Sequence, residues 1–92
     1  MLINKNTIVT PSGNAAVSEL DGGLALIDLD NGNYYHLNKA ATIVWNAIQK
    51  NTSVADIVDL ILAEYDANKD TVLTDVTVMV EDFIKQGFAK AA

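Results

Sequence analysis

The chain carries few of the side chains that catalysis requires. It has one histidine, His36, and no cysteine, which excludes a cysteine nucleophile, a disulfide and a thiolate metal site. Its carboxylates are numerous, but Asp56, Asp59, Glu64 and Asp66 have the spacing of solvated charges on the outer side of a helix or just past it. An active site needs reactive groups that converge. We therefore expect no catalysis and no cofactor or metal.

Other short segments also fail to indicate a chemical site. His36 sits in the apolar run "NYYHL", which is typical of a half-exposed strand residue; a pH-sensitive or partner-contacting role is the alternative. The segment "DANKD" has too few oxygen donors, at the wrong spacing, for a calcium loop. No glycine-rich loop leads from a strand pattern into a helix pattern, so we expect no phosphate-binding loop.

The charge of the chain excludes further classes. Twelve acidic and six basic residues give the 92-residue chain a net charge of −6. Nucleic acids and anionic membranes bind basic surfaces, so we expect neither as a partner, whereas basic partners are favoured. The start "MLINKNTIVTPSG" has no long apolar run, so we expect neither a signal peptide nor a spanning helix. We expect residues 1–92 to form one cytoplasmic domain.

Strand patterns occupy the part of the chain before Leu37. The runs "AAVSEL", "LALIDL" and "NYYHL" are separated by turn formers, which predicts a three-stranded antiparallel meander over about residues 15–37. Asn31 and Gly32 between the last two runs predict a two-residue hairpin loop with both residues at positive φ. This loop would place Leu26 opposite Leu37. The dozen residues before the meander are either an extra strand over the sheet or a loose tail.

Both faces of the predicted sheet are largely apolar. Side chains alternate between faces along a strand, so one face holds Ala25, Ile27, Leu29, Tyr34 and His36, and the other holds Leu24, Leu26, Asp28, Tyr35 and Leu37. An antiparallel sheet with one face in water should instead alternate apolar with polar residues. Helices of this chain or a partner must therefore cover part of each face.

Helical periodicity follows the sheet and makes the fold class α+β. Asn38 is the expected N-cap of a first helix over about 39–49, and Ser53 caps a second amphipathic helix. A third helix covers about 71–86, and Gly87 suits the left-handed position after its end. We expect the helices to fill about residues 39–87.

The third helix is more apolar than one buried stripe requires. Its core face is predicted to hold Leu73, Val76, Val80, Phe83 and Ile84. Val72 and Met79 extend this face sideways, next to Asp75 and Asp82. Either the helix is wedged between two layers, or the extra strip lines a groove.

The order of these pieces resembles the family of coenzyme PQQ synthesis protein D, which contains the small recognition elements for precursor peptides. The likeness covers about Ala15 to Lys90 and rests on several short motifs. These are a hairpin followed by Tyr34, Tyr35, Leu37 and Asn38; the step Ile43, Val44, Trp45; the helix start Ser53, Val54, Ile57; the pair Asp75, Val76; and the closing pair Gly87, Phe88.

The resemblance implies a winged helix-turn-helix-like domain that binds the leader segment of a ribosomally made precursor peptide. The leader would add as an antiparallel strand to the last strand of the sheet and seat its apolar side chains against the third helix. The implied wall residues are each either core or groove, and the two aspartates are either rim contacts for basic leader residues or solvated charges. The implied contacts are Asn33, Tyr34, Tyr35, His36, Leu37, Val72, Asp75, Val76, Met79, Val80, Asp82 and Phe83.

The resemblance leaves the pathway and the assembly open. A small acidic stand-alone domain looks like the recognition protein of lasso-peptide pathways, which presents the precursor to a leader peptidase ahead of a cyclase. A PQQ-type peptide chaperone for a radical enzyme is the rival. A DNA-binding winged helix is disfavoured, because the third helix from 71 to 86 has one lysine against Asp75, Glu81 and Asp82. A generic interaction module is a further alternative, and the protein would be a monomer or a domain-swapped dimer.

Overall fold

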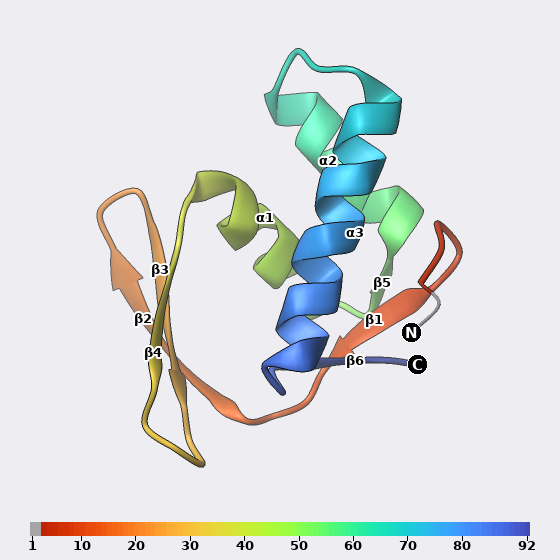
Figure 1. The fold of residues 1–92 in the computed structure, drawn as a ribbon. Helices are drawn as coiled ribbons and strands as arrows, with labels where there is room; N and C mark the ends of the chain where they lie inside the picture. Colours follow the sequence, from red (N-terminus) through yellow and green to blue (C-terminus); the bar gives the residue numbers. More distant parts are fainter. Residues whose placement is uncertain (1–2) are drawn as a thin grey trace.

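The computed structural model describes residues 3–92 as three helices beside two small antiparallel sheets (Figure 1). The strands are β1 (Ile8–Pro11), β2 (Ala15–Leu20), β3 (Gly23–Asp28), β4 (Tyr34–Leu37), β5 (Thr52–Ser53) and β6 (Ala89–Ala91), and the helices are α1 (Lys39–Ile48), α2 (Val54–Glu64) and α3 (Lys69–Lys85). The α+β class, the winged helix-turn-helix-like layout and the order of meander before helices are confirmed. No helix within the described range has the length and apolar character that crossing a membrane requires.

The meander has the strand order β2-β3-β4, so β4 is an outer strand. The predicted assignment of side chains to the two faces is confirmed, because Leu26 pairs with Tyr35 and Ala25 pairs with His36. Leu26 lies on the inner, core-facing side and is fully buried. His36 lies on the outer face and is exposed.

The predicted hairpin loop between β3 and β4 is wrong by two residues. Leu37 pairs with Leu24 rather than with Leu26, and Gly32 has a positive φ of 75° whereas Asn31 does not. A shift of two residues keeps every side chain on its face, because the period of a strand is two. The two-residue turn would have needed both central residues at positive φ.

The wider loop is stabilised by the carboxylate of Asp28, which is 5% exposed. Its Oδ1 accepts hydrogen bonds from the backbone N–H groups of Asp30 (2.8 Å) and Asn31 (3.3 Å) and from the Asn14 side-chain amide (3.3 Å). The loop therefore closes around a buried acceptor.

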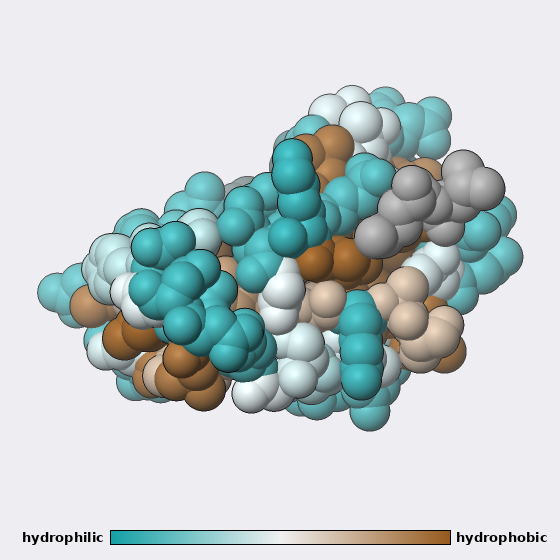
Figure 2. Space-filling view, turned by 60° about the horizontal axis from the view of Figure 1, so that its bottom comes forward, coloured by the Kyte–Doolittle hydropathy of each residue, from teal (hydrophilic) through white to brown (hydrophobic). Residues whose placement is uncertain are grey.

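Figure 2 views the end of the molecule that carries this loop and shows separate apolar areas on a mostly hydrophilic surface.

The second sheet was not expected from the sequence. Its order is β5-β1-β6, and both pairings are antiparallel. The segment before the meander thus contains a strand, β1, as one of the two alternatives for residues 1–13 predicted. This strand pairs with the segments that precede α2 and follow α3 rather than lying over the meander. Residues 1 and 2 of that prediction lie outside the described range. The β1–β6 pairing holds the segment that follows α3 beside β1.

Local capping sets the helix boundaries. The Asn38 side chain accepts from Ala41 N–H at 2.9 Å, and Ser53 accepts from Asp56 N–H at 3.2 Å, both as the sequence predicts. The third helix begins two residues earlier than expected, at Lys69. Its N-cap is Asn68, whose side-chain oxygen accepts two backbone N–H groups.

The buried carboxylate gives a first prediction. Replacing Asp28 with alanine removes the acceptor for three donors, so we expect the free energy of unfolding to fall by about 1–3 kcal/mol in urea unfolding. Asp30→Ala is the matched control in the same loop. Its side chain is exposed, so its effect should stay within about 0.5 kcal/mol. Equal losses in the two variants would contradict the assigned role of Asp28.

Candidate functional site

The outer strand β4 has an unpaired edge whose backbone groups can be assigned. Asp28 N–H donates to the Asn33 carbonyl at 2.8 Å, which makes these two residues a hydrogen-bonded pair. Bonded and non-bonded pairs alternate along an antiparallel ladder. Tyr35 is therefore bonded to β3, whereas Tyr34 and His36 direct their N–H and C=O groups away from it. The free edge consequently offers two donors and two acceptors in an extended arrangement.

A pocket of about 120 Å³ separates β4 from the C-terminal half of α3. Its lining comes from β3, β4, α3 and two residues that follow α3: Leu26, Tyr35, His36, Leu37, Asp82, Phe83, Gln86 and Phe88. A larger pocket of about 310 Å³ lies beside the N-terminal half of α3. It is lined by Ala40, Ile61, Tyr65, Asp66, Ala67, Val72, Asp75, Val76 and Met79.

The residues of the third helix that line the two pockets recur every three or four positions, so both pockets lie along the same side of α3. Together they form what we call the β4–α3 groove. The groove extends along α3 from Gln86 back to Val72. At about 1.5 Å per helical residue this distance is about 21 Å, which matches about six residues of an extended strand.

Phe88 fixes the width of the groove at its C-terminal end. Gly87, at a φ of 84°, lets the chain reverse after α3, and Phe88 is then 1% exposed. The Phe88 ring packs edge-on against Tyr35, with ring centroids 5.1 Å apart, and against Trp45 at 6.3 Å. The Tyr35 hydroxyl donates to Gln86 Oε1 at 3.0 Å. β4 is therefore tied to the end of α3 by both an apolar and a polar contact.

The structure brings most of the predicted site residues together. Those that line the groove are Tyr35, His36, Leu37, Val72, Asp75, Val76, Met79, Asp82 and Phe83. The side chains of Tyr34, which is 60% exposed, and of His36 lie on the outer face of the sheet, so both residues reach the groove side through their backbone. Asn33 lies in the loop before β4. Val80 has no exposed surface and belongs to the core.

The residues of α3 divide between core and groove. Val72, Val76 and Phe83 are at most 7% exposed and form the floor of the groove. Met79 is half-buried at its rim. The exposure of Val78, which is 60% exposed, was not predicted. It depends on how α3 is rotated against the other helices.

Other elements also contribute groove residues that were not predicted from the sequence. Ile61 and Tyr65 extend the larger pocket from α2 and its C-cap. Gln86 and Phe88 belong to the smaller pocket. The amphipathic stripe of α2 contains Ile61 and Tyr65 and was the available signal, but it does not tell which end of the stripe remains accessible.

The groove combines an apolar floor with carboxylates and has no basic lining residue. Asp82 lines the smaller pocket, and Asp66 and Asp75 line the larger one. The one ion pair recorded in residues 3–92 joins Lys39 and Glu64 at 3.9 Å, outside the groove. No cluster of metal-ligating side chains occurs in the same range. This arrangement is suited to holding an extended, partly apolar chain.

The division of α3 can be tested by matched aspartate substitutions. Met79→Asp places the new carboxylate at an accessible rim, so we expect the melting temperature to fall by only a few degrees, on the order of 1 kcal/mol of stability. Val80→Asp buries a charge without a partner and should cost at least about 3 kcal/mol or prevent folding. Thermal unfolding followed by circular dichroism measures both. Similar losses would show that Met79 is core.

The chain is similar to one protein family in sequence and to two solved structures in fold. The sequence profile of the family described as coenzyme PQQ synthesis protein D (PqqD) matches residues 23–89. A structure of TbiB1 in complex with the TbiA(beta) leader peptide has a TM-score of 0.81 and 22% identity, over 88% of this chain and 94% of that one. A lasso peptide synthetase B1 complexed with the leader peptide has a TM-score of 0.80 and 23% identity, over 89% and 96%. No curated protein matches the chain. At these identities the two structures show a shared fold.

Proposed function

Because the chain belongs to the family of coenzyme PQQ synthesis protein D, we propose that it binds the leader segment of a ribosomally made precursor peptide in the β4–α3 groove. The observation that carries the proposal is the unpaired β4 edge directly beside the apolar pocket that separates β4 from α3. A free edge and a groove on the same side are what an added strand needs.

The leader would extend the meander as a fourth, antiparallel strand. Its backbone would pair with the outward N–H and C=O groups of Tyr34 and His36. These bonds give affinity for any sequence, while pockets that take alternate side chains give specificity. The smaller pocket, walled by Tyr35 and Phe83, would take an apolar side chain close to the β4 edge. The role is binding alone, without a catalytic step.

The pathway is the second part of the proposal. Both similar structures described above hold a leader peptide, and one of them is a lasso peptide synthetase B1. This chain spans 94% and 96% of their lengths. We propose that this cytoplasmic domain likewise delivers a lasso precursor to a separate leader peptidase and then to a cyclase. A PQQ-type chaperone that hands its peptide to a radical enzyme is the alternative, favoured by the family profile. Co-purification of each enzyme with the leader-bound protein separates the two pathways.

Substitutions at His36 test the strand addition. His36→Pro removes an outward N–H while leaving the bonds of β4 to β3 in place, and proline is tolerated at a strand edge whose N–H faces solvent. His36→Ala keeps the N–H and removes only the imidazole. Calorimetric titration with the leader of a precursor encoded beside the gene should show at least about a tenfold weaker affinity for the proline variant.

The alanine variant should bind within about threefold of the unsubstituted protein, because an exposed side chain on the outer face contributes little. Circular dichroism confirms that both variants fold. A folded proline variant with full affinity would overturn strand addition at β4. Failure of the unsubstituted protein to bind any neighbouring leader would overturn the proposed function itself.

Salt dependence gives an independent check. Backbone and apolar contacts are little screened by salt, whereas contacts to nucleic-acid phosphates weaken steeply with it. We expect the leader affinity to fall by about tenfold or less between low and moderate salt. A decrease of about a thousandfold, as for DNA binders, would contradict the mechanism.

A further inference from the structure

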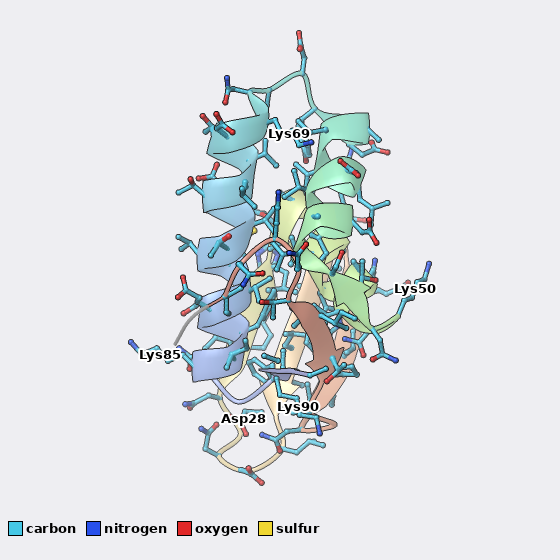
Figure 3. All side chains as sticks on the ribbon, turned by 90° about the vertical axis from the view of Figure 1, so that its right-hand side faces the viewer. Asp28, Lys50, Lys69, Lys85 and Lys90 are labelled. Carbon is cyan, nitrogen blue, oxygen red and sulfur yellow. The ribbon has the colours of Figure 1, made fainter. Side chains whose placement is uncertain are left out.

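The negative charge of the protein is concentrated in one hairpin of helices. Residues 54–82, which span α2 and most of α3, contain eight acidic residues and one basic residue, whereas the rest of the chain contains four acidic and five basic residues. Figure 3 shows Lys69 and Lys85 at the two ends of α3. Between these lysines the helix carries acidic residues and no basic one. The wall of the groove that α3 provides is therefore the acidic part of the molecule.

The charges that reach the groove are of one sign. Each of its two pockets has an α3 carboxylate beside the apolar floor, from Asp82 in one and from Asp75 in the other. No lysine or arginine lines either pocket, and β4 has no charged residue. Lys85 lines a third, more open pocket together with Met79, Glu81 and Asp82. In that pocket two carboxylates stand against one lysine, and no ion pair joins Lys85 to Asp82 among residues 3–92.

We propose that the groove selects a cationic leader segment, with lysine or arginine side chains at two positions that face Asp75 and Asp82. This inference rests on the proposed function and adds the chemical class of the bound peptide. Long basic side chains lay their methylene stems along apolar surface and keep the charge at its edge. Half-buried Met79, between the two aspartates along α3, provides such a surface. An acidic segment would instead meet like charges without compensation, which excludes it.

The geometry also predicts the spacing of the two basic residues. Asp75 and Asp82 are two helical turns apart, about 10.5 Å along the axis. Side chains on one side of a strand recur about every 6.7 Å, so the basic residues should lie two or four positions apart in the peptide. Three positions apart would direct them to opposite sides.

Selection from a library of random dodecapeptides tests this without knowledge of the natural leader. We expect peptides captured by the unsubstituted protein to be enriched in lysine and arginine at the predicted spacing, together with apolar residues. Selection on Asp75→Asn/Asp82→Asn should retain the apolar preference and lose the basic one. Both aspartates are exposed, so we expect this variant to keep the fold.

A titration of one selected peptide completes the test. The double variant should bind it about four- to twentyfold more weakly, since an exposed ion pair changes affinity by about two- to fivefold. Glu19→Gln/Asp59→Asn is the matched control, because it removes the same charge from exposed positions outside the groove. Its affinity should stay within about twofold. Replacing the peptide's basic residues with glutamine should reproduce the loss on the unsubstituted protein.

Three outcomes would overturn the inference. Peptides that bind the groove but show no basic enrichment would refute the cationic class while supporting strand addition, provided that His36→Pro abolishes their binding. Equal losses in the control and the test variant would show that net charge alone attracts the peptide. Failure to capture any peptide that depends on His36 N–H would overturn the proposed function together with this inference.

Discussion

The packing of Phe88 between β4 and α1 is the contact on which the rest of the site depends. Phe88 follows the reversal at Gly87 and is buried against Tyr35 and Trp45. This places the C-terminal end of α3 next to an unpaired strand edge and leaves space between them. The β1–β6 pairing, next to Phe88, closes the same end from the other side. The groove is therefore a consequence of how the chain ends its last helix.

The alternation of hydrogen bonds in the meander determines what this edge offers. β3 bonds to β2 on one side and to β4 on the other, so every second residue of β4 is committed to β3. Tyr35 combines this inward bonding with a side chain on the groove side, and it is the residue that contacts Phe88 and Gln86. Tyr34 and His36 have their side chains on the outer face and their backbone groups at the edge. The backbone groups that hold β4 to β3 and those left free to pair with a peptide thus belong to different residues of one short strand.

Local chemistry in the sequence predicts much of this fold but not its long-range details. The N-caps Asn38 and Ser53 and the reversal at Gly87 depend on neighbouring residues and were predicted correctly. The β3–β4 register was predicted wrongly, because Asp28 stabilises a wider loop than the two-residue turn. Asp28 does so together with Asn14, which is distant in sequence and directly precedes β2. Strands β5 and β6 are too short to show a period, and the separation of groove from core on α3 depends on tertiary packing.

Amide hydrogen exchange of β4, with and without a leader peptide, tests the central claim most directly. In the free protein the N–H of Tyr35 should exchange slowly, and those of Tyr34 and His36 should exchange fast. Saturating peptide should slow Tyr34 and His36 by about tenfold or more, because their N–H groups gain acceptors. A bound peptide that leaves both amides exchanging fast, or that protects a different surface instead, would contradict strand addition to β4.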